Sequence, residues 1–177
     1  VGIHTSDLTR YFLGEITDVY GISTERVWKV PGSEDNAMAV FRNPEGLAAS
    51  YQATWTEWKG YGFFIEAYGD KGMVRAAYAP MHNTLITMDR PGGDRTTTVK
   101  RYLDGIVREK LFTWKTTALQ SFREELDDFL RLCEGRRDLT IADGYAGLRA
   151  AEVAEAVRHS STSGEAVHLP VLGRMPA

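Results

Sequence analysis

The side chain best suited to chemistry in this sequence is the imidazole of His4, which lies three residues before Asp7. An imidazole has a reference pKa of about 6.5, so small changes in its surroundings let it take or give a proton near neutral pH. His4 can therefore act on a hydroxyl group, and Asp7 can orient His4 or bind a substrate. The residues alone also allow a structural histidine that hydrogen-bonds the first turn of a helix, and an Asp7 that only stabilises the helix dipole.

A second polar and aromatic group consists of Arg75, Tyr78 and His82, which follow a turn between two glycines. These side chains can contact a ligand, although the same pattern is found on an ordinary sheet surface. His159 and His168 are expected at surface or edge positions. Because the histidines are scattered and lack metal-ligand spacing, we predict no metal site.

The tryptophans and the single cysteine are more simply interpreted as structural residues than as parts of a site. Aromatic rings can stack on sugars, but tryptophans are more often found in a core or an interface, and this applies to Trp28, Trp55, Trp58 and Trp114. Cys133 falls on the apolar stripe of a predicted helix, and it is therefore expected in the core.

The element predicted to position His4 is a short helix. Thr5 or Ser6 can cap its start with a side-chain oxygen, and Gly14 stands where a C-terminal cap is expected. An apolar stripe at i, i+3 and i+4 is formed by Leu8, Tyr11 and Phe12. His4 is predicted in the turn just before this helix, among backbone N–H groups that have no partner inside it.

The rest of the chain shows strand signals followed by helical ones. Strands are expected within 15–31, 37–41, 47–58, 61–68, 73–78, 84–88 and 96–102, separated by turns rich in Gly, Pro, Asn and Asp. A long helix is predicted from Thr117 to a stop at Gly135, and a second one over about 142–160 with Leu148, Ala151 and Val157 inward. The tail at 165–170 alternates like an edge strand, and the pattern at 103–114 is ambiguous.

Composition excludes several classes of function. The 177 residues, 43% hydrophobic and 25% charged, are typical of one globular domain, so residues 1–177 are predicted to form a single domain. A formal charge of −3 argues against nucleic acid as a partner. One cysteine excludes an internal disulfide and fits the cytoplasm, and no apolar run is long enough to span a membrane.

Several motifs resemble the C-terminal domain of the Gfo/Idh/MocA oxidoreductases, the family of glucose-fructose oxidoreductase and inositol dehydrogenase. The first is G-I-H-x-x-D-x-x-R-Y-x-x-G, from Gly2 to Gly14. In chain order it is followed by the G-x-x-G turn at 69–72, by I-A-D-G-Y at 141–145, by H-S-S at 159–161 and by V-x-L-P at 167–170. The resemblance thus runs over nearly the whole chain.

The resemblance implies a function and a site. In that family the histidine of the first motif acts on the reacting hydroxyl or carbonyl of a sugar or polyol, which makes His4 the expected catalytic residue. Asp7, Arg75, Tyr78 and His82 become expected substrate contacts. The intact enzyme is expected to use NAD or NADP, held by a preceding nucleotide-binding domain that also supplies a lysine.

The resemblance also implies the architecture and the partners. The expected fold is α+β, a large and mainly antiparallel open β-sheet with helices packed on one face. A homo-oligomer is expected to form through the sheet face. This chain lacks a G-x-G-x-x-G turn and a βαβ pattern, so the N-terminal nucleotide-binding domain is absent from it and the isolated chain is expected to bind no cofactor.

Two other interpretations remain open at this point. The chain can be a free-standing α+β binding or dimerisation module that has no redox activity. It can also be an unrelated α+β hydrolase, although the serines near 160 lack a nucleophile pattern and no partner base is evident.

Overall fold

The computed structural model describes residues 2–78, 81–137 and 141–171. The chain divides into two units, one formed by Val1–Trp58 with Ala142–Ala177 and the other by Lys59–Ile141. Each unit is described by itself, as the first unit and the second unit.

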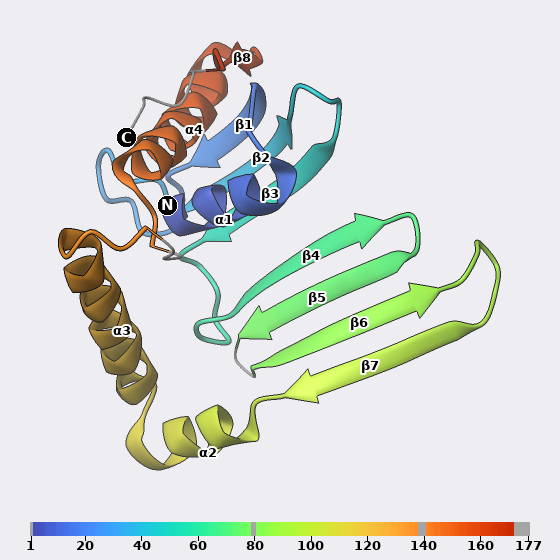
Figure 1. Cartoon of the computed structure of the whole chain (residues 1–177). Helices are drawn as coiled ribbons and strands as arrows, with labels where there is room; N and C mark the ends of the chain where they lie inside the picture. The colour runs from blue at the N-terminus through green and yellow to red at the C-terminus, as the bar shows by residue number, and fades with distance from the viewer. Residues whose placement is uncertain (1, 79–80, 138–140, 172–177) are drawn as a thin grey trace. The chain divides into compact units, whose positions relative to one another are not determined.

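The first unit is a four-stranded antiparallel sheet with two helices. Its strands are β1 (Asp18–Thr24), β2 (Asn36–Arg42), β3 (Ala48–Thr54) and β8 (Val167–His168), in the spatial order β3-β2-β1-β8. Helix α4 (Gly144–Ser163) packs against β1, and α1 (Ile3–Leu13) packs against β3 and α4, so both helices cover the same face (Figure 1).

The core lies between this sheet face and α4. Strand β2 alternates strictly, because successive side chains of a strand point to opposite faces. The inner face and the helices contribute Ile16, Val19, Phe41, Tyr51, Val153 and Val157, all of them buried. The outer face carries Tyr20, Ile22, Met38 and Val40, all about half exposed.

A close approach joins α4 to β1. A Cβ on Gly21 would lie 2.8 Å from the Val157 Cγ1 atom, so a larger residue at this place would push the helix away from the strand. The buried Ser160 side chain fixes the same contact, because its hydroxyl accepts the Gly21 N–H at 3.0 Å and donates to the Glu165 carbonyl at 2.6 Å.

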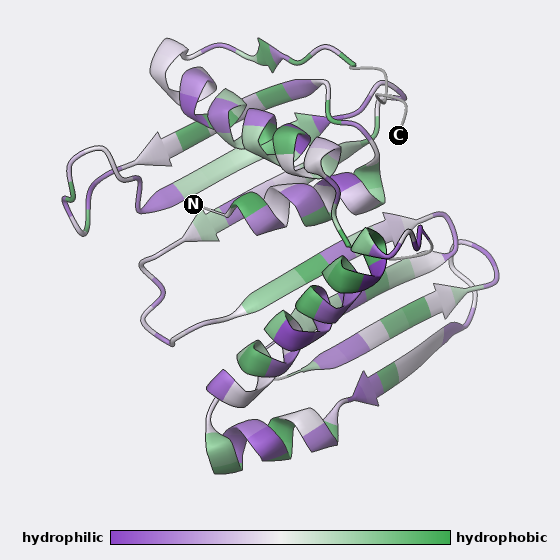
Figure 2. Cartoon of the chain, turned by 60° about the vertical axis from the view of Figure 1, so that its left-hand side comes forward, coloured by the Kyte–Doolittle hydropathy of each residue, from purple (hydrophilic) through white to green (hydrophobic). Residues whose placement is uncertain are grey.

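The second unit is an antiparallel meander followed by two helices. Its elements are β4 (Phe63–Gly69), β5 (Gly72–Tyr78), β6 (His82–Met88), β7 (Arg95–Arg101), α2 (Leu103–Phe112) and α3 (Lys115–Cys133). Hydrophobic and hydrophilic residues alternate along α3 (Figure 2). Its apolar stripe, Leu119, Phe122, Leu126, Phe129 and Leu130, is more than half exposed throughout.

The α+β class and the antiparallel pairing are confirmed, with the strands arranged in two four-stranded sheets rather than one large sheet. The strands expected within 37–41, 47–58, 61–68 and 73–78 are present and form two hairpins, β2–β3 and β4–β5. The strands near 84–88 and 96–102 and the edge strand in the tail are present too. The ambiguous segment forms α2. His159 and His168 are exposed, as expected.

Some expectations about local structure are wrong. Helix α1 begins at Ile3 and not after Thr5 or Ser6, because Gly2 serves as the N-cap and no side chain caps the helix. Residues 25–35 form a loop instead of continuing the first strand, which ends at Thr24.

Other errors concern which side chains face inward. Leu148 and Ala151 of α4 are exposed, whereas Ala150 and Val153 are buried with Val157. Cys133 is exposed and not in the core, because the stripe of α3 on which it lies is exposed.

Phe41 provides a test of this core, because its ring is fully buried. Replacing Phe41 with alanine should lower the free energy of unfolding of the chain by about 3–5 kcal/mol, measured in urea. The matched control is Phe12→Ala, since the Phe12 side chain is 52% exposed, and it should change the free energy by less than about 1 kcal/mol. Equal losses in the two variants would contradict the assignment of the core.

Candidate functional site

His4 lies in the first turn of α1, and its side chain is exposed. It therefore belongs to the helix itself rather than to the turn before it, which corrects the expected position. The carbonyl of Gly2 accepts the N–H groups of Thr5 at 2.9 Å and Ser6 at 3.1 Å, so the helical hydrogen bonds begin at Gly2. The imidazole thus stands on ordered backbone and faces outward.

The N-cap glycine rests on a buried tyrosine. Gly2 has φ +77°, and a Cβ on it would lie 2.0 Å from the Tyr51 hydroxyl oxygen and 2.7 Å from the Ala53 Cβ. Only glycine fits here, because the backbone angle and the space both exclude a side chain. Burial raises the pKa of Tyr51 above its ordinary value, and the nearby Ser6 hydroxyl acts in the opposite direction.

Asp7 lies in the second turn of α1 and forms an ion pair with Arg10, at 3.4 Å between Oδ1 and Nη1. The first turn contains no acidic residue, so Asp7 is too far along the helix to stabilise its N-terminal dipole strongly. Asp7 is one helical turn from His4 and on the same side of the helix.

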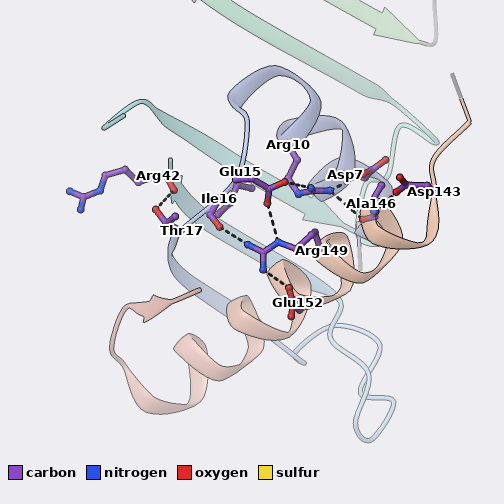
Figure 3. Close-up of polar contacts among 10 residues, drawn as sticks. All are labelled: Asp7, Arg10, Glu15, Ile16, Thr17, Arg42, Asp143, Ala146, Arg149 and Glu152. Carbon is purple, nitrogen blue, oxygen red and sulfur yellow. Dashed lines mark hydrogen bonds and ion pairs between the residues drawn. The ribbon is translucent and has the colours of Figure 1, made fainter. Parts of the chain in front are cut away.

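A largely buried polar cluster of the first unit centres on Arg149 and Glu15 (Figure 3). The Arg149 guanidinium, on α4, is fully buried, and its Nε donates to the Glu15 Oε2 at 3.0 Å. Its remaining nitrogens donate to the Glu152 carboxylate and, at 3.3 Å, to the Ile16 carbonyl. The charge of this arginine is therefore neutralised in the interior.

Glu15 connects this cluster to α1. Its other oxygen accepts a hydrogen bond from Arg10 at 2.6 Å, and Arg10 also donates to the Ala146 carbonyl at 3.2 Å. Burial alone would raise the pKa of Glu15, but the hydrogen bonds and charges of Arg10 and Arg149 outweigh burial and lower this pKa. A single carboxylate thus joins α1 and α4.

This cluster was not identified from the sequence, although one signal was present. Arg149 precedes Val153 by four residues and Ala156 by seven, so it lies on the apolar stripe of α4. A charged residue inside such a stripe is almost never buried unless it is paired.

The other candidate residues lie in the second unit. Arg75, on β5, forms an ion pair with Glu66 at 2.7 Å and lies over the Phe64 ring at 4.2 Å. His82 opens β6, opposite Ala77 of β5. Because Arg75 and Ala77 are two residues apart on one strand, Arg75 and His82 share a sheet face.

Tyr78 points to the opposite face of the same sheet, since it is three residues from Arg75. Its hydroxyl donates to the Glu109 carboxylate of α2 at 2.7 Å. Burial and this hydrogen bond raise the pKa of Tyr78 to about 12, so the phenol keeps its proton at neutral pH. The predicted group Arg75, Tyr78 and His82 is thus divided between the two faces of the sheet.

Two hollows are found in the first unit. One, of about 270 Å³, has a lining that includes Ile3, the neighbour of His4, together with Tyr51, Val157 and Arg158. The other, of about 340 Å³, lies in the loop region around Trp28 and Trp55. Within the described residues, no group of three or more His, Cys, Asp or Glu side chains could hold a metal ion.

Comparison with known proteins agrees with this architecture. Residues 1–75 match the family described as the GFO/IDH/MocA C-terminal domain. A search of curated proteins finds no match. In the part of the chain that the structure describes, every helix is too short or too polar to cross a membrane.

Solved structures with a similar fold are oxidoreductases. A levoglucosan dehydrogenase in complex with NADH aligns with a TM-score of 0.74 at 18% identity, covering 97% of this chain and 50% of the other. The WlbA dehydrogenase from Bordetella pertussis, in complex with NADH and UDP-GlcNAcA, gives 0.67 at 20%, covering 96% and 46%. An oxidoreductase from Agrobacterium radiobacter, with NAD+, L-tartaric acid and magnesium, gives 0.69 at 20%, covering 95% and 47%.

The chain therefore spans about half the length of these proteins. The expected resemblance to the Gfo/Idh/MocA C-terminal domain is confirmed by the family match at 1–75 and by the shared fold.

The Glu15 cluster can be tested by removing one charge. Glu15→Gln leaves the buried Arg149 with one carboxylate fewer, so the free energy of unfolding at pH 7 should fall by about 1–3 kcal/mol. Because the pKa of Glu15 is lowered on folding, its contribution is present above the unfolded pKa of about 4.5 and is lost as the pH falls through the lower folded value. The variant should therefore lose less stability than the wild type on acidification.

Urea unfolding between pH 3 and pH 7 measures both effects. The matched control is Glu155→Gln, which breaks the exposed ion pair with Arg158 and should cost less than about 1 kcal/mol. If the two substitutions had the same effect, Glu15 would not join the two helices energetically.

Proposed function

We propose that this chain is the substrate-binding and dimerisation domain of an NAD(P)-dependent oxidoreductase acting on a hydroxyl or carbonyl group of a sugar, polyol or related compound. Two observations support the proposal: the family match covers the segment that contains His4, and the fold is shared with dehydrogenases over nearly the whole chain. The working compartment would be the cytoplasm, which the single unpaired cysteine fits.

The nucleotide cofactor would be held outside this chain. A dinucleotide site needs parallel strands joined by a crossover helix with a glycine-rich turn. All strand pairs among the described residues are antiparallel, and the sequence has no G-x-G-x-x-G turn. The residues present therefore do not fit the cofactor, and only the binding of substrate and the movement of its proton fall to this chain.

His4 is the residue proposed to move that proton, and the observation that carries the assignment is its exposed place on an anchored first turn. Oxidation of an alcohol to a carbonyl releases a proton from oxygen as the carbon gives up a hydride. An imidazole with a pKa near neutrality can accept the proton in this direction and return it in the other. Gly2 and Tyr51 hold the backbone beneath the imidazole, which limits the positions it can take.

Four further residues are proposed as substrate contacts. Asp7 lies one helical turn from His4, and its carboxylate can accept hydrogen bonds from sugar hydroxyls. Arg75 and His82 share one sheet face and can donate to oxygen atoms. Tyr78 lies on the opposite face, where its hydroxyl donates to Glu109 and its oxygen can still accept a hydrogen bond. Their ion pairs and hydrogen bonds with protein groups fix their positions in the absence of a ligand.

A second copy of the chain is the proposed partner of the outer sheet face in the first unit. Tyr20 and Ile22 on β1 stand opposite Val40 and Met38 on β2, and each of these side chains is about half exposed. An exposed apolar patch on two neighbouring strands is typical of an interaction surface.

The assignment of His4 is tested in the intact enzyme that includes the nucleotide-binding domain. His4→Ala should lower kcat by about 100-fold or more, the usual contribution of a general acid or base, with no change in the unfolding midpoint. His159→Ala provides the matched control, because His159 is exposed on α4 and should leave turnover unchanged. Normal turnover in the His4 variant would favour a binding or dimerisation module without redox chemistry at this residue.

The proposed interface on the outer sheet face can be tested by introducing a charged side chain. Val40→Lys places an ammonium group in the centre of the apolar patch, so sedimentation velocity should detect dissociation into single chains. Leu47→Lys is the control, since Leu47 is 55% exposed and Val40 is 54% exposed, but Leu47 lies in the turn before β3. A Val40 variant that remained associated would exclude this face as the interface.

A further inference from the structure

One hollow in the first unit is lined by none of the residues proposed above for proton transfer, substrate binding or the interface. It has a volume of about 340 Å³ and is lined by Trp28, Val30, Ser33, Glu34, Asp35 and Trp55. We call it the tryptophan pocket. Its volume lies at the lower end of the range for small-molecule sites, about 300–1,000 Å³.

The loop that forms this pocket is built around one buried carboxylate. Asp35 is 2% exposed and accepts the backbone N–H groups of Arg26 at 3.0 Å and Trp28 at 3.1 Å, as well as that of Val27. Burial alone would raise the pKa of Asp35, but these hydrogen bonds outweigh it and lower the pKa to about 2. The loop is therefore ordered, and Asp35 is ionised at neutral pH.

Two tryptophans are held in place although both remain largely exposed. The Trp28 Nε1–H donates to the Trp55 carbonyl at 3.0 Å, and the Trp55 N–H donates to the Asp35 carbonyl at 2.8 Å. The side chains are 54% and 68% exposed. The Trp28 ring and the Trp55 backbone are therefore held in place, and both exposed rings leave contact surface available to a ligand.

The charge of the lining selects the class of ligand. Glu34 and Asp35 supply two carboxylates, and none of the six lining residues is a lysine or an arginine. Arg158 on α4 acts on Glu34 but is paired with Glu155. Lys29, between Trp28 and Val30, is exposed and does not line the pocket. An anion would be repelled, whereas a cation would meet the Glu34 carboxylate and the electron-rich faces of indole rings.

We propose that the tryptophan pocket binds an organic ammonium cation, held by Trp28, Trp55 and the carboxylate of Glu34. Cation–π attraction is strongest for tryptophan, and quaternary ammonium groups are well suited to it because they are large and weakly hydrated. This binding is independent of the proton transfer proposed for His4.

Choline chloride is the probe for this proposal. The indole Nε1–H signals of the chain, followed by ¹H–¹⁵N NMR during the titration, report on each tryptophan separately. The signals of Trp28 and Trp55 should shift in a saturable manner, while those of Trp58 and Trp114 should not. Sodium chloride at equal ionic strength controls for salt, and the uncharged 3,3-dimethyl-1-butanol has the same shape as choline without its charge.

Two variants identify the groups responsible. Trp55→Leu removes the ring but keeps the backbone groups that bond to Trp28 and Asp35, and it should weaken choline binding by about 3- to 30-fold. Glu34→Gln should weaken it by several-fold. Trp58→Leu is the matched control, because Trp58 is 88% exposed and does not line the pocket, and it should leave choline affinity unchanged.

Four results would overturn the proposal. Equal binding of choline and its uncharged analogue would indicate a merely apolar site. Saturable shifts with D-glucose but not with choline would indicate a sugar platform instead. An absence of saturable shifts at up to 100 mM choline, or unchanged affinity in the Trp55 variant, would show that the pocket does not recognise ammonium groups.

Discussion

The neutralisation of Arg149 is the constraint on which the first unit depends. A guanidinium group removed from water is strongly unfavourable unless its charge and its donors are matched. Here the donors reach two carboxylates and one carbonyl, and those groups come from α4 itself and from the segment between α1 and β1. The position of α4 on the sheet and the path of the chain leaving α1 are therefore fixed together.

This constraint extends to the helix that carries His4. The last turns of α1 are held by Arg10, which bonds to Glu15, and by Asn43, whose amide donates to the Leu13 carbonyl at 2.8 Å. The first turn is held by Gly2 against Tyr51. Since both ends of α1 are fixed by buried or partly buried groups, the backbone beneath the exposed imidazole keeps a defined position.

The sequence predicts the hairpins of this protein well because their signals are local. Alternating residues and turns rich in glycine, asparagine and aspartate act over a few neighbours, and β2, β3, β4 and β5 were found close to their true bounds. The start of α1 was misplaced because a glycine with positive φ replaced the side-chain cap that Thr5 or Ser6 could have provided. Val27, Trp28 and Val30 favour a strand. The segment is a loop because the Asp35 carboxylate accepts three backbone N–H groups at residues 26–28.

The candidate site was less predictable, since it depends on contacts between distant residues. His4 and Asp7 could be found from one motif, whereas the Arg149 and Glu15 pair is separated by 134 residues in sequence. The inward face predicted for α4 contains Leu148 and Ala151, whereas the buried face contains Arg149, Ala150 and Val153.

The two faces of the sheet in the first unit help to explain why proton transfer is proposed at the start of α1 and not on the sheet. The inner face carries small residues beneath α4, with Gly21 and Ala39 allowing the helix to approach closely and cover this part of the sheet. The outer face carries Tyr20, Met38 and Val40, which offer mainly apolar area. The first turn of α1, anchored on Tyr51 of the edge strand β3, lies at an edge of these layers, which supports the proposal that His4 moves the proton.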